Sequence, residues 1–253
     1  MTNPATDQKH GHVLITGASR GIGAACAAIL AKARFDVVLW ARSEPELHAV
    51  QGVCISHGVD SRAAVVDVSD PQSVFGPGIA SLAGLNSLRG CVLNAGVGIW
   101  GSVADLSVEQ WRSVVTTNLD GAFYSLKAAL PLLREHPNAQ IVAMGSDSAH
   151  TGYALRSAYC ASKAGLDGFL RTVRRETRAD GIRLTSLVMS RVDTFFRSKK
   201  PGDRPNSLSV DEVSRVVEWI FLAPPKTEIR EVHFSAIAES FGAYPETAKE
   251  ISR

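Results

Sequence analysis

A short apolar run that leads through a glycine-rich turn into a helical pattern constrains this chain more than any other segment. Residues 13–15 are Val-Leu-Ile, the turn holds Gly17, Gly21 and Gly23, and residues 24–32 are rich in Ala, Ile and Leu. A strand, a glycine-rich turn and a helix N-terminus in this order form a phosphate cradle, because the first N–H groups of the helix point toward the ligand.

The three glycines would have separate tasks in such a cradle. Gly17 permits the tight turn, Gly21 lets the backbone approach a pyrophosphate, and Gly23 lets the helix pack against the strand. Their spacing is G-x-x-x-G-x-G, whereas the more common dinucleotide pattern is G-x-G-x-x-G. Taken alone, the segment is also compatible with a glycine-rich turn that binds no ligand.

The rest of the chain alternates between short apolar runs and longer helical patterns. This alternation predicts right-handed βαβ crossovers and a parallel sheet with helices on both faces, which is a single Rossmann-type, doubly wound α/β domain over residues 12–253. A dinucleotide would lie in the crevice above the carboxyl ends of the strands. The polar residues 1–11 are expected to form a flexible tail. The expected strands are 12–16, 36–41, 63–67, 90–93, 139–145, 182–188 and 230–235, and the expected helices lie near 21–33, 44–57, 71–82, 107–134, 157–179 and 210–222.

Composition agrees with a globular domain. An apolar fraction of 45% supports a sizeable core. A net charge of +2 spread along the chain indicates neither a nucleic-acid partner nor a membrane surface. The four cysteines form no C-x-x-C pair, so we expect free thiols and neither a metal site nor a disulfide framework. No apolar run is long enough for a signal peptide or a membrane span, which favours a soluble, cytoplasmic protein.

Tyr159 and Lys163 form the strongest chemical signal in the chain. In a helix, residues four apart lie on one face, so the ammonium of Lys163 can favour the phenolate and lower the phenol's pKa from its ordinary value of about 10. A tyrosine tuned in this way can exchange a proton with a carbonyl or an alcohol near neutral pH. The pattern Y-x-x-x-K also recurs by chance on helices, so its weight depends on the rest of the chain.

Four motifs follow one another in order along the chain. They are T-G-x-x-x-G-x-G beginning at Thr16, the tripeptide Asn94-Ala95-Gly96, Ser146 thirteen residues before Tyr159, and Y-x-x-x-K. Together they cover about residues 13–194, and this series resembles the short-chain dehydrogenase/reductase family.

The resemblance implies four catalytic roles. Tyr159 exchanges the proton, and Lys163 lowers the pKa of Tyr159 and hydrogen-bonds the nicotinamide ribose. Ser146 orients and polarises the substrate carbonyl, and Asn118 binds the water that connects Lys163 with solvent for proton resupply. The ordinary alternatives are a strand-end cap for Ser146 and an exposed helix position for Asn118. The hydride itself would come from the cofactor.

The end of the second expected strand bears on the choice of cofactor. Ala41 stands where an NAD-specific member would carry Asp or Glu to bind the ribose hydroxyls. Arg42 follows it and Arg20 lies in the glycine-rich loop, and a guanidinium binds phosphate with a bidentate fork. Ser43 adds a hydroxyl donor. We therefore expect NADP(H), with solvated surface arginines as the alternative.

Further cofactor contacts follow from the resemblance by position. They are Ser19, Ile22, Asp67, Val68, Asn94, Ala95, Gly96, Val192 and Thr194. Two segments depart from the family pattern. The usual P-G-x-V-x-T reads Met-Ser-Arg-Val-Asp-Thr at 189–194, which changes the backbone options below the nicotinamide. The usual Asp-Gly-Gly after the last strand reads Phe-Ser-Ala-Ile at 234–237, which leaves the oligomer interface and the pocket floor open.

Aromatic and thioether side chains are expected to form the substrate pocket around Ser146 and Tyr159. By position they are Trp100, His150, Tyr153, Met189 and Phe195, the last of which begins a lid at about 195–209. The basic stretch 197–204 could meet an anionic substrate, a CoA phosphate or an acidic carrier protein, or it could be a solvated loop.

We interpret the chain as an NADP(H)-dependent carbonyl reductase or alcohol dehydrogenase. A 3-oxoacyl-carrier-protein or CoA-thioester reductase is the alternative of the same class. A non-catalytic NADP-binding sensor is the alternative of a different class, and the Ser-Tyr-Lys set argues against it. The helical stretches 107–134 and 157–179 carry more apolar surface than one sheet face can cover, so we expect a homodimer or a homotetramer.

Overall fold

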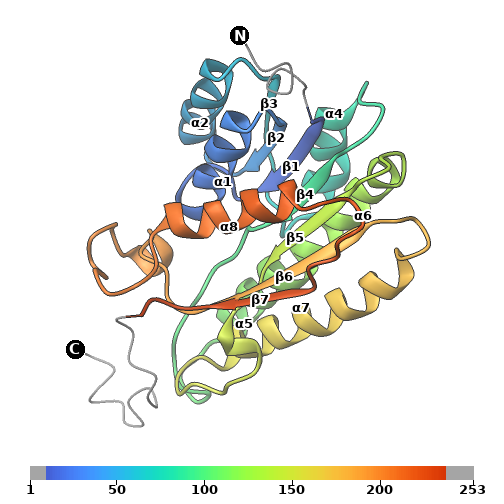
Figure 1. Cartoon of the computed structure of the whole chain (residues 1–253). Helices are drawn as coiled ribbons and strands as arrows, with labels where there is room; N and C mark the ends of the chain where they lie inside the picture. Colours follow the sequence, from blue (N-terminus) through green and yellow to red (C-terminus); the bar gives the residue numbers. More distant parts are fainter. Residues whose placement is uncertain (1–9, 238–253) are drawn as a thin grey trace.

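The computed structural model describes residues 10–237, and its centre is a parallel seven-stranded sheet (Figure 1). The strand order is β3-β2-β1-β4-β5-β6-β7, and every neighbouring pair is parallel. The order reverses at β1, which pairs with β2 on one side and β4 on the other. The strands are β1 (His12–Thr16), β2 (Asp36–Ala41), β3 (Ser61–Val65), β4 (Gly90–Leu93), β5 (Gln140–Met144), β6 (Arg183–Met189) and β7 (Glu231–Phe234).

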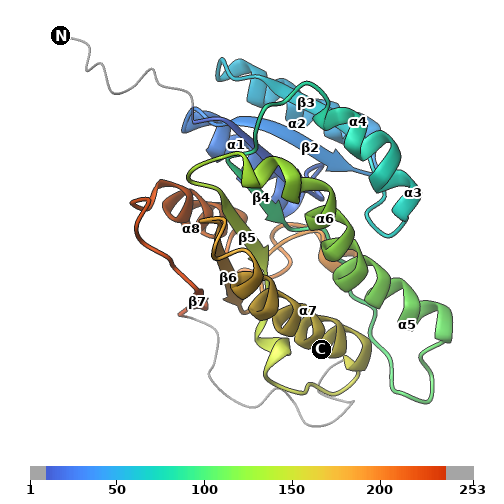
Figure 2. The same cartoon turned by 90° about the vertical axis from the view of Figure 1, so that its right-hand side faces the viewer.

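Helices cover both faces of the sheet (Figure 2), which confirms the predicted doubly wound α/β class. One face packs against α1 (Gly21–Lys32), α2 (Glu44–Ser56) and α8 (Val210–Leu222). The other packs against α4 (Ile79–Leu82), α6 (Gly121–Arg134) and α7 (Ser157–Glu176). Two shorter helices, α3 (Pro71–Ser73) and α5 (Val108–Val115), precede α4 and α6 in the chain.

The central strands are apolar throughout because both of their faces are buried. In β1, Val13 and Ile15 join the core beneath α1, α2 and α8, whereas Leu14 joins the core beneath α6 and α7. Successive side chains of a strand point to opposite faces, so a sheet covered on both sides needs continuous apolar runs instead of alternating ones.

Most element boundaries agree with the sequence prediction to within a few residues, and the differences have local causes. β3 spans Ser61–Val65 instead of 63–67. Beyond it, the Asp67 backbone N–H donates to Ser73 Oγ at 3.0 Å and the Asp67 carboxylate accepts from the Ser69 N–H at 2.9 Å, so a turn begins there. The single helix predicted at 107–134 contains a π-helical turn, Thr116–Asp120, between α5 and α6.

The first described residues already pack against the fold. The ring of His10 stacks on Phe35 with 4.7 Å between centroids, and the Gly11 carbonyl accepts from the Asp36 N–H at 3.1 Å. Residues 10 and 11 of the predicted tail are therefore part of the packed fold, and its residues 1–9 lie outside the described part. The end of the chain at 238–253, which bears on the predicted oligomer interface, also lies outside it.

The four cysteines are free thiols. Cys26, Cys54 and Cys91 are buried, and burial raises their pKa to about 12, 11 and 12, so they act as small apolar side chains. Between residues 10 and 237, no helix combines the length and the apolar character needed to cross a membrane.

Candidate active site

A cavity of about 930 Å³ opens at the carboxyl ends of the strands. Its lining follows the strands one after another, with Gly17 after β1, Ala41 at the end of β2, Val66 after β3, Asn94 after β4 and Gly145 after β5. The cavity therefore straddles β1, where the strand order reverses, which is the ligand position expected in a doubly wound sheet.

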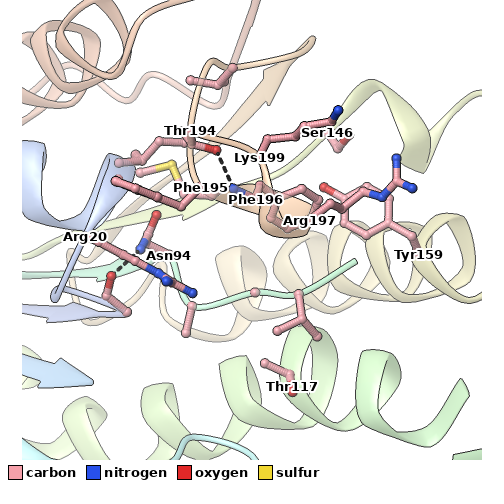
Figure 3. A pocket seen from close by; sticks show the side chains of 18 of the residues that line it. Arg20, Asn94, Thr117, Ser146, Tyr159, Thr194, Phe195, Phe196, Arg197 and Lys199 are labelled. Carbon is pink, nitrogen blue, oxygen red and sulfur yellow. Dashed lines mark hydrogen bonds between the residues drawn. The ribbon is translucent and has the colours of Figure 1, made fainter. Parts of the chain in front are cut away.

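Most of the residues predicted for the site line this one cavity. They are Gly17, Ser19, Arg20, Gly21, Ile22, Arg42, Ser43, Asp67, Val68, Asn94, Ala95, Gly96, Trp100, Ser146, Tyr153, Tyr159, Lys163, Met189, Val192, Thr194 and Phe195. The other three are Gly23, Asn118 and His150, which lie outside its lining. Figure 3 shows Arg20 and Asn94 on one side of the cavity, Ser146 and Tyr159 on the other, and the lid residues 194–197 between them.

In the glycine-rich turn, neighbouring atoms leave no room for a side chain at Gly17 or Gly23. Gly17 has φ +65°, and a Cβ on Gly17 would lie 2.9 Å from Asn94 Nδ2. A Cβ on Gly23 would lie 2.3 Å from the Gly17 carbonyl oxygen, so Gly23 supports the close approach of α1 to the turn from outside the cavity. Gly21, with φ +57°, stands at the N-terminus of α1 and lines the cavity. The turn leads into the N-terminus of α1, where a helix presents its first N–H groups to an anion such as a pyrophosphate.

Asn94 and Thr16 tie the loop after β4 to this turn. Asn94 Nδ2 donates to the carbonyls of Thr16 and Gly17 at 2.8 and 3.2 Å. In return, Thr16 Oγ1 accepts from the N–H groups of Asn94 and Ala95, both at 3.0 Å. These bonds hold two cofactor-contacting loops at a fixed separation, and they give Asn94 a structural role that its position in the sequence does not reveal.

Two guanidiniums line the end of the cavity nearest to β2. Ala41 ends the strand without a carboxylate, and Arg42 Nη1 lies 4.0 Å from Asp67 Oδ2. Arg20 also lines the cavity, with its Cζ 5.8 Å from the centre of the Phe195 ring. The residues present fit a nicotinamide dinucleotide.

The end of β6 supplies a further polar group where the family pattern has glycine. Ser190 Oγ is buried in the cavity wall and has no hydrogen-bond partner among the described residues. A buried hydroxyl normally has a partner. Ser190 precedes Val192 and Thr194, which were predicted to contact the cofactor and also line the cavity.

Tyr159 and Lys163 lie one turn apart on α7, and Ser146 follows β5. Lys163 Nζ is 5.8 Å from the centre of the Tyr159 ring and donates to the Met144 carbonyl at 2.6 Å. Ser146 acts on the Tyr159 phenol and lowers its pKa. The structure thus brings together the serine, the phenol and the ammonium that the resemblance assigned to catalysis.

The pKa of Tyr159 differs from the sequence prediction in this structure. Burial raises it to about 12, while Ser146 acts in the opposite direction. The prediction of a lowered value was wrong here because loss of solvent has the largest effect on the phenol's pKa. Burial also lowers the pKa of Lys163 to about 8. At neutral pH the phenol is therefore protonated, as a proton donor to a carbonyl must be.

Asn118 connects two parts of the site through its side chain. Its Oδ1 accepts from the Val97 N–H at 2.8 Å, and its Nδ2 donates to the Val97 carbonyl at 2.9 Å and to Ser162 Oγ at 3.0 Å. These contacts fix the loop after β4 against α7. The predicted role of Asn118 in holding a water stays a prediction.

His150 is the one predicted substrate residue that the structure places elsewhere. The chain turns through a short 3₁₀ helix, Asp147–Ala149, directly after Ser146. His150 then stacks on His233 of β7, with 6.2 Å between ring centroids. The turn carries the imidazole toward the sheet edge, so the assignment of His150 to the pocket was wrong.

An aromatic cluster forms the wall next to Tyr159. Trp100 lies 5.2 Å from Tyr159 and 6.1 Å from Phe196 between ring centroids, and Tyr159 lies 5.8 Å from Phe196. Phe196 was noticed in the sequence only as part of the lid, and the structure makes it a direct neighbour of the phenol.

Asp147, which directly follows the predicted Ser146, was expected in the pocket segment 147–153 but was assigned no role from sequence. Its Oδ1 accepts from Ser146 Oγ at 3.0 Å, and its Oδ2 accepts from the Tyr153 hydroxyl at 2.9 Å. The carboxylate thus holds two predicted site residues in place. The sequence did show a carboxylate directly after a serine at a strand end, and this neighbour could have indicated the contact.

The lid is folded onto the cavity through backbone contacts. Arg204 donates to the carbonyls of Val192 and Phe196, both at 3.3 Å, and Asp193 Oδ2 accepts from the Gly202 N–H at 2.5 Å. A bridge pairs Val192 with Leu208. Arg197, which begins the basic stretch noted in the sequence, lines the cavity, and so does Arg156, which was not noted there.

Comparison with known proteins agrees with this geometry. The family model described as short chain dehydrogenase matches residues 11–204. The chain belongs to this family.

Individual relatives are distant but cover most of the chain. The 3-oxoacyl-acyl-carrier-protein reductase FabG of Aggregatibacter actinomycetemcomitans is 30% identical over 88% of this chain and 90% of its own length. Sepiapterin reductase of Chlorobaculum tepidum is 28% identical, with 87% and 93% covered. The matched segment spans only 60% of the length of an uncharacterized oxidoreductase of Bacillus subtilis, at 32% identity.

Solved structures share the whole fold of this family member. An alcohol dehydrogenase from Thermococcus sibiricus, complexed with 5-hydroxy-NADP, has a TM-score of 0.87 and 27% identity, with 92% of this chain and 99% of that chain covered. A metagenomic short-chain oxidoreductase in complex with NADP has a TM-score of 0.78 and 27% identity, with 89% and 96% covered.

Proposed function

We propose that this protein is an NADP(H)-dependent carbonyl reductase or alcohol dehydrogenase. The observation that carries the proposal is the meeting of Ser146, Tyr159 and Lys163 at the carboxyl end of β5, inside the same cavity as the glycine-rich turn. A protein that only bound a dinucleotide would have no use for a phenol and an ammonium next to the substrate space. The non-catalytic alternative is therefore less well supported.

The proton chemistry follows from three side chains. Ser146 donates a hydrogen bond to the substrate carbonyl oxygen, and Tyr159 donates the proton that this oxygen needs when the carbonyl is reduced. Lys163 hydrogen-bonds the nicotinamide ribose and supports reprotonation of the phenol. NADPH, when bound, supplies the hydride, and the protein supplies orientation and the proton. In the oxidative direction the tyrosinate accepts the alcohol proton.

Selectivity for NADP(H) over NAD(H) rests on the β2 end of the cavity. Arg20 and Arg42 offer two guanidiniums to a 2′-phosphate, and Ser43 offers a hydroxyl. Ala41 stands where a carboxylate would repel that phosphate. Two structural relatives are described as complexes with NADP or a derivative of it, which supports the same choice.

Reduction of a 3-oxoacyl thioester is the alternative within the same class. It is favoured by the similarity to FabG and by the cationic lid. Acetoacetyl-CoA distinguishes it from simple ketones, because a thioester reductase should prefer that substrate by a wide margin.

The assembly and the location are further parts of the proposal. Trp111 on α5 and Phe123 on α6 leave 39% and 43% of their surface exposed, which suits helix pairing across a two-fold axis. We expect a homodimer or a homotetramer in the cytoplasm. Sedimentation at micromolar concentration tests this, and a stable monomer of 27.0 kDa would contradict it.

Turnover is tested by NADPH absorbance with a panel of ketones, aldehydes and acetoacetyl-CoA. We expect oxidation of NADPH that depends on a carbonyl substrate and that is far slower with NADH. A protein that binds NADPH but turns over no member of the panel, in either direction, would favour the non-catalytic alternative.

A further inference from the structure

Cations gather at the substrate end of the cavity as well as at the cofactor end. Arg156 stands directly before α7, whereas Arg197, Lys199 and Arg204 come from the lid, and all four line the cavity. Two separate parts of the chain therefore bring positive charge to one place. The basic stretch seen in the sequence is in part a wall of the cavity and not only a solvated loop.

These guanidiniums are close enough to affect one another. Burial lowers the pKa of Arg197, and the charges of Arg156 and Arg204 lower it further. Burial and Arg191 lower the pKa of Arg204, while the carboxylates of Asp193 and Asp203 raise it. Like charges held together in a partly buried site favour the binding of an anion between them.

Trp100 holds two of the guanidiniums beside the reacting phenol. The Cζ atoms of Arg197 and Arg156 lie 4.4 and 5.1 Å from the centre of the Trp100 ring, and Arg156 also lies 4.9 Å from the centre of the Tyr153 ring. These are cation–π distances. A guanidinium carries its N–H donors in a planar fork, and this is the geometry that binds a carboxylate or a phosphate. Figure 3 shows Arg197 on the side of the cavity that holds Tyr159.

We propose that Arg156 and Arg197, which both contact the ring of Trp100, bind an anionic group of the carbonyl substrate. The preferred substrate would then be a small oxo acid. The ring of Trp100 also lies 5.2 Å from Tyr159. The anionic group, a carboxylate or a phosphate, is therefore only a few bonds from the carbonyl carbon. This inference rests on the proposed reductase function and specifies its substrate class.

Matched pairs of acid and ester test the charge separately from the shape. The pairs are 4-formylbenzoate with its methyl ester and 4-oxopentanoate with its methyl ester, each assayed with saturating NADPH. We expect kcat/KM for the acid to exceed that for the ester by roughly tenfold to a hundredfold, the range typical of a charge-assisted hydrogen bond. Equal values, or a preference for the esters, would overturn the proposal.

Variants assign the preference to the two guanidiniums. Arg197→Met and Arg156→Met should each lower the acid-to-ester ratio of kcat/KM roughly tenfold, and Arg197→Lys should lower it less. Lys200→Met is the matched control, because Lys200 is an exposed cation of the same lid outside the cavity lining. A ratio that both arginine variants leave unchanged would contradict the assignment.

Acetoacetyl-CoA and the acetoacetyl thioester of N-acetylcysteamine separate a nearby charge from a distant one. The phosphates of CoA lie at the far end of a long pantetheine arm, so we expect similar kcat/KM values for the two thioesters. A preference for the CoA ester that Arg197→Met abolishes would place the anion far from the carbonyl and overturn the proposal.

A binding measurement keeps this inference distinct from the proposed catalytic function. Calorimetry of benzoate with the NADP⁺-saturated protein should show binding that Arg197→Met weakens roughly tenfold and Lys200→Met does not. If no carbonyl compound oxidises NADPH, the catalytic proposal fails, and the benzoate result alone decides whether the anion site exists. Benzoate affinity that is the same in all three proteins would refute it.

Discussion

The two ends of the cavity are built by different means. At the cofactor end, short turns directly follow the strands, and backbone groups are held by hydrogen bonds such as Asn94 Nδ2 to the Thr16 carbonyl at 2.8 Å. At the substrate end, long side chains from the lid and from the segment before α7 meet around Trp100. Arg197 there adopts φ +61°, a conformation that a non-glycine residue rarely takes.

The cofactor end therefore depends on backbone spacing, and the substrate end depends on which side chains meet. A phosphate cradle depends on glycine at a few backbone positions, so a single set of spacings serves many proteins of the family. A substrate wall depends on which side chains meet in space, and each chain can change them without disturbing the sheet. Variants at each end of the cavity test whether cofactor binding and substrate turnover can be changed independently.

The largest expected effect separates chemistry from cofactor binding. Tyr159→Phe removes the proton donor and leaves the glycine-rich turn unchanged, so kcat should fall roughly hundredfold to ten-thousandfold while the affinity for NADPH is retained. NADPH fluorescence titration and carbonyl-dependent turnover measure the two quantities. Lys163→Ala should lower both kcat and the affinity for NADPH, because Lys163 is proposed to support Tyr159 and to bind the nicotinamide ribose. Near wild-type turnover by Tyr159→Phe would mean that another group supplies the proton.

The pH dependence should differ between the two directions of the reaction. Because burial raises the pKa of Tyr159 to about 12, the phenol is protonated at neutral pH and carbonyl reduction should change little between about pH 6 and pH 8. Alcohol oxidation needs the phenolate, whose fraction grows about tenfold per pH unit below the pKa, so kcat/KM for oxidation should rise with pH. An oxidation rate independent of pH over this range would mean that the phenolate is already formed, as the sequence had predicted.

The third prediction concerns the cofactor end alone. Arg20→Ala and Arg42→Ala should each weaken NADPH binding roughly tenfold to a hundredfold and NADH binding much less, because only NADPH carries the 2′-phosphate. Arg215→Ala, which removes an exposed arginine of α8 outside the cavity, is the control. Equal losses for both cofactors, or a wild-type preference for NADH, would contradict the NADP(H) assignment.

The smallest effects test the boundary of the substrate end. Tyr153→Phe removes the hydrogen bond to Asp147 that indirectly positions Ser146, so kcat/KM should fall roughly twofold to tenfold. His150→Ala should change it by less than about twofold, because the imidazole stacks on His233 outside the cavity lining. A larger loss of kcat/KM in His150→Ala than in Tyr153→Phe would show that His150 takes part in the site after all.

Local sequence patterns sufficed for the architecture and for most of the cofactor end. Short apolar runs predicted all seven strands, most clearly in β2 and β4, whose residues are all buried because both faces of the sheet are covered there. The glycine spacing predicted the cradle, because φ values of +65° at Gly17 and +57° at Gly21 are available to glycine at little cost. The order of the motifs along the chain was enough to recognise the family.

The tertiary structure alone decided the substrate end and the electrostatics of the phenol. Nothing in the local sequence shows that the 3₁₀ turn at Asp147–Ala149 carries His150 away, or that Arg156 and Arg197 meet on the ring of Trp100. The sequence shows the lysine one turn from Tyr159, but not the burial that raises the phenol's pKa. Helix and strand patterns are short-range properties of the backbone, whereas burial and the meeting of long side chains depend on residues far apart in the chain, and only the folded molecule brings those residues together.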